Sequence, residues 1–489
     1  MDKLAKHEGL LDSLPDSILC HILSFLLARD AVRTSVLSPR WRYLFTSSIS
    51  RLDFDDIHVD LPNSQVPEEH IESFKKFVDR LFSNPKHLSL ESFVVSDRSL
   101  DADCLPIDNW LCAALLCGVK EIDVHLFPEE IRKLSTLLFT CPSLVTLKLD
   151  MLGSEMKLPT NVCLPNLSTL HLSDMELVDG CSFHGLISGC PVLQDFDLSD
   201  CYLTGASELN IHSLSLRRLV LEFENLDDFG CVIVIDAPNL VYFEYFCRVG
   251  KICILRTMES LEKADITISP EPCASLFQAI CKVHVLHLSI IGYDDSLFQR
   301  PLDPVLAFHN LVELKFKNRC VERTIYVAWI LEFLHCAPNL KTLIMDFVDS
   351  NTVFELLPEE VPTCLLYHLN KIEILYITAD THMFEMVSYF LNHALVLEKL
   401  VMRSRSIDSP QECRGYALRN MESLEKADIT IFNFNNVDRE RSAALLQGIC
   451  NVQDLHLSII EHDAPPLIRT PLDPVFAWIW LMQTEYLSH

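Results

Sequence analysis

The sequence predicts an α/β protein in which a small N-terminal group of helices precedes an irregular solenoid with a curved parallel sheet. Three observations lead to this fold class. The chain has 489 residues, more than the roughly 250–300 at which a single core stops growing. A short apolar motif recurs through most of that length, whereas the first fifty residues follow a helical period.

Composition limits the classes of partner. Apolar residues make up 49% of the chain and charged residues 22%, which is typical of a folded protein rather than a disordered one. Asp and Glu number 68 against 40 Lys and Arg, so the net charge is −28. We expect no nucleic-acid partner and no membrane partner, because both present anionic surfaces.

The cysteines and the N-terminus predict the compartment. The first residues lack the apolar core of a signal peptide, and the longest uncharged stretches contain proline and polar residues, so none predicts a spanning helix. We therefore expect a cytoplasmic or nuclear protein, in which the 19 cysteines stay reduced. They show no CxxC pair and no zinc-type spacing, and we expect no metal and no cofactor.

The N-terminal module is predicted to hold three helices. The first helix, within residues 14–26, carries one wide apolar stripe made of Ile18, Leu19, Ile22, Leu23 and Leu26. Asp30 can cap a second helix that ends at Leu37, and Ser38-Pro39 can start a third that contains Trp41. Three helices in roughly 40 residues make a small core at best, so the module needs a partner to bury its apolar edge.

The rest of the chain is dominated by the pattern apolar-x-x-apolar-x-apolar. Its starting residues are Val119, Leu144, Leu167, Leu193, Leu216, Leu240, Leu261, Val283, Leu311, Leu340, Ile372, Leu397, Leu424 and Val452, with a possible earlier unit at Ile49. The spacing is close to that of a leucine-rich repeat, roughly 20–29 residues. The last two apolar residues of each motif point to one face of a short strand, and the residues beside them point to the other. Stacked units of this kind form a parallel sheet with a continuous core behind it.

The segments between the motifs predict the layer that covers this core. Residues 129–139 and 329–335 have helical apolar spacing, and a proline followed by Asn or Ser precedes many motifs, as at Pro165-Asn166. Several cysteines lie two to four residues before a strand, and we interpret them as small buried apolar groups. They are Cys141, Cys190, Cys281, Cys336 and Cys450.

Two stretches carry a family resemblance. The first consists of Leu14-Pro15-Asp16, Ile18-Leu19, Ile22-Leu23, Leu26, Asp30-Ala31-Val32, Ser35-Val36-Leu37-Ser38 and Arg40-Trp41-Arg42. This segment resembles the F-box, and is most similar to the large plant class that joins an F-box to leucine-rich repeats. Leu27-Ala28 stands where Pro-Thr is usual, and Pro39 where Lys or Arg is common, but neither change removes an apolar contact. Residues 358–366, 386–391 and 396–400 resemble the FBD module of the same class, which implies further strand–helix units.

The C-terminal part repeats an earlier segment. Residues 256–268 return almost unchanged as 419–431, residues 286–291 return as 455–460, and residues 301–304 return as 471–474. The first copy continues into the motif at Leu311, whereas the second departs from the pattern after Trp478. Either the array lacks its terminal cap or the end of the gene has been misread. We expect residues 479–489 to form no strand.

These observations divide the chain into six parts. We expect an F-box at 8–50, a linking segment with the first irregular repeats at 51–118, and leucine-rich repeats at 119–346. FBD-like strand–helix units follow at 347–403, a duplicated repeat segment at 404–478, and a tail at 479–489.

The motifs of catalysis are missing from the sequence, which has no nucleophile elbow, phosphate-binding loop, dinucleotide fingerprint or HExxH. We assign no catalytic residue and expect a protein that is not an enzyme. The F-box resemblance implies a substrate-recognition subunit of an SCF-type cullin–RING ubiquitin ligase, in which the F-box docks a Skp-type adaptor. The alternative is a non-catalytic leucine-rich-repeat scaffold without ligase association. The expected adaptor-binding residues are Leu14, Pro15, Ile18, Leu19, Ile22, Leu23, Leu26, Val36, Leu37 and Trp41.

The same resemblance implies that the repeats bind a protein substrate, whose identity the sequence does not give. Outward positions of neighbouring motifs form columns along the sheet, and exposed aromatic residues are favoured binding anchors. We hypothesise that the substrate docks across Asp195 to Phe246, with a basic patch meeting the two aspartates; packing of Phe246 under a loop is the alternative. The candidate residues are Asp195, Asp197, Arg218, Tyr242, Glu244 and Phe246.

Overall fold

A computed structural model shows the architecture. It describes residues 14–26, 50–53, 78–82, 90–97, 106–126, 135–156, 161–178, 181–204, 208–223, 232–247, 251–254, 258–268, 274–290, 307–317, 323–346, 350–353, 360–377, 389–390, 392–404, 426–432 and 454–460, with single positions 34, 37, 38, 40, 41, 44, 76, 159, 386 and 387. The chain forms two compact units. The first unit is Met1–Asn239 with Val249–Leu255, and the second is Leu240–Arg248 with Arg256–His489.

Parallel strands stack side by side in the first unit. They are β1 (Arg51–Asp53), β2 (Ser92–Asp97), β3 (Glu121–Leu126), β4 (Thr146–Met156), β5 (Thr169–Val178), β6 (Asp195–Ser199) and β9 (Arg218–Phe223), with β7 (Tyr202–Thr204) beside the end of β5. Each strand begins two residues after the first apolar residue of its motif, as Thr146 follows Leu144. Apolar side chains at the second and third motif positions are buried, and those beside them are half-buried, for example over β3 and β6. The period of two expected from the sequence is therefore confirmed.

A regular hydrogen-bond ladder joins each repeat to the next just before the strands begin. The carbonyl oxygen of Lys120 accepts hydrogen bonds from the amides of Val145 and Thr146, and the carbonyl of Val145 does the same for the next repeat. The Pro-Asn lead-in adds a side-chain bond, because Asn166 Nδ2 donates to the carbonyl of Pro142 in the preceding repeat over 2.8 Å. Lead-in asparagines therefore satisfy backbone groups that would otherwise lie unpaired between repeats.

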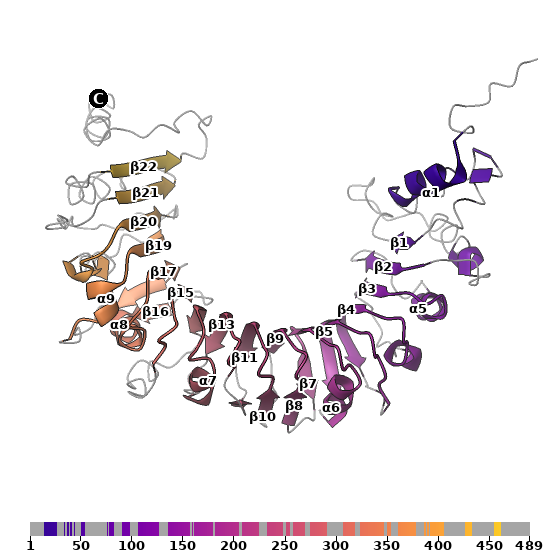
Figure 1. Ribbon diagram of the computed structural model, residues 1–489, viewed down its shortest axis with the longest axis horizontal. Coiled ribbons are helices and arrows are strands. Elements are labelled where there is room, and N and C mark those ends of the chain that lie inside the picture. Colours follow the sequence, from indigo (N-terminus) through magenta and orange to yellow (C-terminus); the bar gives the residue numbers. More distant parts are fainter. Residues whose placement is uncertain are drawn as a thin grey trace, which may run out of the picture. The chain divides into compact units, whose positions relative to one another are not determined.

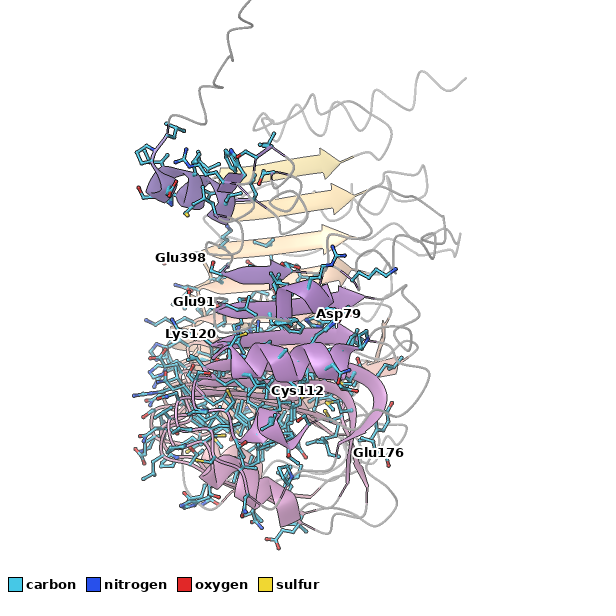
Figure 2. The ribbon with its side chains drawn as sticks, turned by 90° about the vertical axis from the view of Figure 1, so that its right-hand side faces the viewer. Asp79, Glu91, Cys112, Lys120, Glu176 and Glu398 are labelled. Atoms are coloured by element: carbon cyan, nitrogen blue, oxygen red, sulfur yellow. The ribbon has the colours of Figure 1, made fainter. Side chains whose placement is uncertain are left out.

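Helices and strands together cover the apolar side of the first sheet. The helices are α5 (Ile107–Leu116), the 3₁₀ turn η4 (Thr136–Phe139) and α6 (Cys181–Ser188). A separate parallel sheet of β8 (Glu208–His212), β10 (Val232–Asp236) and β12 (Lys251–Ile254) continues this layer. Helix α6 packs against β8, and Figure 1 shows α6, β8 and β10 on the same side of the β-ladder. Figure 2 shows α5 across the strands, with Lys120 and Glu91 at one edge, where they form an ion pair of 2.6 Å.

The second unit repeats this plan. Its parallel ladder runs in the order β11 (Tyr242–Cys247), β13 (Lys263–Ile268), β14 (Val285–Ile290), β15 (Glu313–Lys317), β17 (Thr342–Asp346), β19 (Lys371–Ile377), β20 (Lys399–Ser404), β21 (Lys426–Phe432) and β22 (Asp454–Ile460). The opposite layer holds α7 (Ala274–Ala279), α8 (Val327–His335) and α9 (Thr363–Tyr367), and a small sheet pairs β16 (Arg323–Tyr326) with β18 (Ser350–Val353). Phe277, Phe308, Phe316 and Phe333 form an aromatic cluster in the core between these layers.

The structure corrects four expectations about the repeats. The motif assigned to Ile372 starts instead at Leu369, because Ile372 pairs with Leu343 and so occupies a strand position. Strand β2 follows a motif at Leu90 that was not predicted. The covering layer of the first sheet also contains strands, β8, β10 and β12, which the helical spacing between the motifs did not predict. Cys141, Cys190 and Cys336 are buried as expected, but Cys281 is only partly buried.

Several expectations fall on residues outside the described part of the chain. These are the capping role of Asp30, the environment of Cys450 and the conformation of residues 479–489. They stay predictions.

Candidate binding surfaces

The predicted apolar stripe of the N-terminal module divides into a core and a surface. Helix α1 (Asp16–Ser24) buries Leu19 and Leu23, which join Trp41 and Leu44 in the core of the module. The exposed apolar residues are Ile18 (45% exposed), Phe25 (76%), Leu26 (38%) and Leu37 (63%). We name these four residues the N-terminal apolar surface. Exposed apolar residues gathered in so short a segment make this surface a candidate docking site.

The sequence placed ten residues on this surface, and the structure assigns them different roles. Leu19, Leu23 and Trp41 lie inside the module, so they support the surface rather than form it. Pro15, Ile18, Leu26 and Leu37 are exposed, Leu14 and Ile22 are half-buried, and Val36 lies outside the described residues. Phe25 was not predicted, although it follows Ile18 by seven residues and Ile22 by three, which places it at the edge of the same helical stripe.

Polar contacts fix the start of α1 against the helical residues that follow Ser38. Arg40 Nη2 donates to the carbonyl oxygen of Leu14 over 2.6 Å, and Arg40 Nε donates to Asp16 Oδ1 over 2.8 Å. The amide of Trp41 donates to Ser38 Oγ over 3.4 Å, as predicted for an N-capping serine. These contacts orient the two segments that carry the N-terminal apolar surface.

The outward face of the first sheet carries charged side chains that neutralise one another. Arg218 Nη1 lies 2.8 Å from Asp195 Oδ1 and 3.0 Å from Asp197 Oδ2, so one guanidinium bridges both predicted aspartates. His171 Nε2 lies 3.2 Å from Asp195 Oδ2. Burial opposes ionisation of Asp195, but hydrogen bonds and charge from His171 and Arg218 lower its pKa. The aspartate pair is therefore already compensated within the chain, which removes the main reason to expect a basic patch on the partner.

A second network on this face centres on His125. Its Nε2 lies 2.7 Å from Asp123 Oδ1 on the same strand, and its Nδ1 lies 3.1 Å from Asp150 Oδ2 on the next. The hydrogen bond with Asp123, the hydrogen bond with Asp150 and the charges of both carboxylates together raise the pKa of His125 to about 9 against the opposing effect of burial. Lys148 Nζ approaches Asp123 at 3.7 Å. His125 is therefore a cation at neutral pH.

The three predicted residues in the second unit share strand β11. Tyr242 donates its hydroxyl to Glu244 Oε2 over 2.6 Å, and the Lys263 ammonium lies 5.9 Å from the centre of the Tyr242 ring. Tyr242, Glu244 and Phe246 are all half-buried on the outward face. This arrangement offers aromatic surface with one charged group on each side of the tyrosine.

Among the described residues, the most buried charge on the outward face of the second unit is Asp265. Its Oδ2 lies 3.2 Å from His287 Nδ1 and 2.5 Å from Lys317 Nζ, which reaches across β14 from β15. Burial opposes ionisation, but these two partners lower the pKa of Asp265 to about 2. Similarly, Lys315 of β15 forms an ion pair of 3.1 Å with Asp346 of β17. These cross-strand pairs were not predicted, although residues at matching positions of consecutive motifs would have suggested them.

In the described part of the chain, no three His, Cys, Asp or Glu side chains gather in a metal-binding arrangement. No helix there is both long enough and apolar enough to span a bilayer.

The fold and these surfaces define a repeat protein whose short N-terminal module carries an exposed apolar surface. Comparison with protein families places an F-box domain at residues 11–53, the repeats of the family described as "FBD-associated F-box protein At5g56370, LRR repeats" at 107–295, and an FBD at 357–402. The chain belongs to the plant family of F-box/FBD/LRR-repeat proteins.

Relatives matched over two thirds or more of their length support this membership. The F-box/FBD/LRR-repeat protein At2g26030 of Arabidopsis thaliana is 30% identical over 422 residues, covering 80% of this chain and 91% of the relative. The putative F-box/FBD/LRR-repeat protein At3g59240 is 31% identical over 69% of this chain and 68% of its own length. The FBD-associated F-box protein At5g22730 is 28% identical over 86% and 93%.

Proposed function

We propose that this protein is a non-catalytic substrate-recognition subunit of an SCF-type cullin–RING ubiquitin ligase. The observation that carries the proposal is the N-terminal apolar surface of Ile18, Phe25, Leu26 and Leu37 on an F-box. This surface docks a Skp-type adaptor, and through the adaptor the cullin.

The energetics of the module favour such docking. Its core is supplied by a few buried side chains, among them Leu19, Leu23 and Trp41, so the exposed apolar residues are not needed to complete that core. Fully burying a large apolar side chain is worth about 1.5–3 kcal/mol, and a few such anchors supply most of the energy of an interface. The four exposed apolar residues therefore provide the anchors of the proposed interface.

The repeats bind the protein to be modified. Two patches are proposed for this role, each within its own unit: Asp195, Asp197 and Arg218 on the first sheet, and Tyr242, Glu244 and Phe246 on β11. The first patch offers a compensated hydrogen-bonding network, and the second offers aromatic surface. Holding a substrate beside a recruited ubiquitin-conjugating enzyme raises the effective concentration of its lysines, so the subunit needs no catalytic group of its own.

Co-purification of the full chain with a Skp-type adaptor and a cullin tests the ligase association. The informative variant is Ile18→Ala with Leu37→Ala, because both side chains are exposed and their loss leaves the core intact. Leu152→Ala is the matched control, since Leu152 is an exposed apolar residue on β4. We expect the double variant to lose the adaptor and the control to retain it. Adaptor binding that survives the double change, or that the unchanged chain never shows, would favour a binding scaffold without ligase association.

The substrate patches need a separate test. Tyr242→Ala removes the aromatic ring, and Asp197→Asn weakens the Arg218 bridge without reversing charge. If a patch binds the substrate, its variant slows substrate ubiquitination while adaptor binding persists. Normal turnover by both variants would place the substrate elsewhere on the repeats.

A further inference from the structure

A backbone hydrogen bond joins the lead-in of one repeat to the lead-in of the next at several places along the chain. The residue three places before a motif donates its amide to the carbonyl oxygen of the residue four places before the following motif. Met258 donates in this way to Ala279 over 3.1 Å, and Phe308 donates to Cys336 over 2.7 Å. The bond therefore brings two successive lead-in backbones into contact at a fixed position.

At one of these contacts, both lead-ins carry a cysteine. Leu164 donates its amide to the carbonyl oxygen of Gly189 over 2.9 Å. Cys163 directly precedes the donor, and Cys190 directly follows the acceptor. Gly189 has no side chain, and a Cβ placed there would lie 2.5 Å from the carbonyl oxygen of Val162. The backbone before Cys163 is therefore packed directly against the backbone before Cys190.

Peptide geometry limits the distance between the two cysteines. The planar peptide holds the α-carbon of Cys163 at about a right angle to the N–H bond of Leu164, so that carbon lies about 4 Å from the oxygen of Gly189. The α-carbon of Cys190 lies about 3 Å from the same oxygen across its own peptide bond. The two α-carbons are therefore at most about 7 Å apart, which a disulfide can span.

The two thiols differ in exposure. Cys163 is exposed and Cys190 is buried. Burial raises the pKa of Cys190 to about 12, and the charge of a Cys163 thiolate adds to the rise, so the two sulfurs influence each other. The thiolate is the reactive form of cysteine, and Cys163 is the thiol that an oxidant reaches first. Redox-sensitive cysteines are solvent-accessible and often have a resolving cysteine beside them.

The contact between lead-ins does not itself require cysteine. The two positions hold Ala307 and Ala337 at the contact made by Phe308, and Thr257 and Ile280 at the contact made by Met258. Packing as a small apolar group accounts for the buried Cys190, but it does not account for the exposed thiol of Cys163.

We propose that hydrogen peroxide converts Cys163 and Cys190 into a reversible disulfide that locks two neighbouring repeats together. The Cys163 thiolate attacks one peroxide oxygen, so an S–O bond forms, the O–O bond breaks and hydroxide leaves. Sulfur loses two electrons in this step, and the peroxide gains them. The sulfur of Cys190 then displaces the hydroxyl group of the resulting sulfenic acid, and water leaves with the proton of Cys190. A dithiol reductant returns two electrons and two protons and restores both thiols.

The position of the disulfide determines what it locks. Cys163 precedes β5, and Cys190 follows α6, so the bond closes a loop that contains both elements. Cross-linking the ends of such a loop restricts its open states. The inference goes beyond the proposed ligase role, because neither cysteine belongs to the F-box or to the two candidate substrate patches. A chain that fails to bind the adaptor can still form the disulfide, and the reverse also holds.

Peptide mapping of the unchanged full chain tests the bond directly. The reduced chain is treated with hydrogen peroxide, its remaining thiols are blocked with N-ethylmaleimide, and it is cleaved after glutamate without reductant. Cleavage at Glu176 separates the two cysteines, so a disulfide appears in mass spectrometry as a linked pair of peptides. We expect fragmentation to identify Cys163 and Cys190 in that pair, and dithiothreitol to remove it. The proposal would be overturned if Cys163 stayed reduced, stopped at sulfinic or sulfonic acid, or joined a different cysteine or a second copy of the chain.

A variant tests whether Cys190 resolves the sulfenic acid of Cys163. In Cys190→Ser the sulfenic acid has lost its partner, so trapping of oxidised Cys163 with dimedone should rise severalfold above that in the unchanged chain. Cys141→Ser is the matched control, because Cys141 is also buried three residues before its motif and also precedes a proline. The control should be labelled like the unchanged chain. Equal labelling of all three chains would mean that Cys190 does not react with Cys163.

Hydrogen exchange measures the locking. The amides of α6 should exchange more slowly in the oxidised chain than in the reduced chain, because opening of the loop is restricted. Cys163→Ser, treated with peroxide in the same way, should show no such slowing. Exchange in α6 that oxidation of the unchanged chain does not slow would contradict the proposed lock.

Discussion

The F-box and the repeat sheet expose side chains of opposite character. The F-box leaves Phe25 and Leu37 largely exposed. The repeat sheet exposes charged residues, but those with a described geometry are bound to one another across strands, as Arg218 is to Asp195 and Asp197. An exposed apolar surface gains stability when a partner covers it. A polar face whose charges compensate one another is stable alone, and its fixed hydrogen-bonding groups can select a particular partner.

The largest effect is expected inside the F-box. Leu23→Ala removes a buried side chain and should destabilise the module by about 2–5 kcal/mol, enough to unfold a core of this size. Ile18→Ala, one turn away on the exposed side of α1, should leave stability within about 0.5 kcal/mol. Hydrogen exchange of the α1 amides measures both. Equal exchange rates of the α1 amides in the two variants would mean that Leu23 and Ile18 do not differ as core and surface residues.

A second large loss of stability is expected when Arg218, whose positive charge compensates two aspartates, is removed. Arg218→Ala leaves Asp195 and Asp197 side by side and partly buried without their shared cation. We expect a loss of about 1–3 kcal/mol in the free energy of unfolding, measured by urea denaturation. Arg217→Ala is the matched control, because Arg217 is the exposed neighbour on the lead-in to the same strand. If Arg217→Ala lost as much stability as Arg218→Ala, the loss would come from the local strand rather than from the ion pairs of Arg218.

Sequence periodicity predicted the sheet well because every repeat obeys the same local rule. Apolar residues at fixed spacing, such as Leu144, Leu147 and Leu149, must be buried together wherever the strand lies. Ile372 shows where this rule fails, since two overlapping patterns fit the same stretch and only pairing with Leu343 decides between them. Strand β10 was missed because Gly230 stands where the motif needs an apolar residue three positions before Ile233, although Ile233 and Ile235 are buried as in any strand.

The candidate sites divide in the same way. Helical spacing located the apolar stripe of α1, but it could not separate Leu19, which is buried, from Ile18, which is exposed, because that depends on where Trp41 packs. The Asp195–Arg218 bridge joins residues of different repeats, and sequence spacing alone does not pair them. Cross-strand register therefore carries the information that the sequence lacked.

A smaller effect, the dependence of stability on pH, should further distinguish the repeat sheet from the F-box. The folded-state pKa of His125 is about 9, above its ordinary value of 6.5. Its contribution to stability is therefore fully present below about pH 6.5 and is lost as the pH rises through about 9. Urea denaturation of the full chain between pH 6 and pH 10 should show a decline that His125→Gln lacks. The F-box variants described above should keep the loss of stability with rising pH. If His125→Gln also kept it, the loss would have to come from another titrating group.

The smallest effect should come from the lead-in asparagines. Asn339 Nδ2 donates to the carbonyl of His309 over 2.9 Å, and Asn310 Nδ2 donates to the carbonyl of Lys282 over 3.3 Å. Both side chains are exposed, so water can replace either hydrogen bond. Each Asn→Ala change should therefore lower the free energy of unfolding by no more than about 1.5 kcal/mol. The shorter bond has the better geometry, so Asn339→Ala should exceed Asn310→Ala. Hydrogen exchange of the strand amides that follow, in β17 and β15 respectively, resolves this difference more finely than global unfolding. The reverse order would mean that the bond length in this ladder does not determine its contribution, and that the asparagines act through the conformation of the lead-in instead.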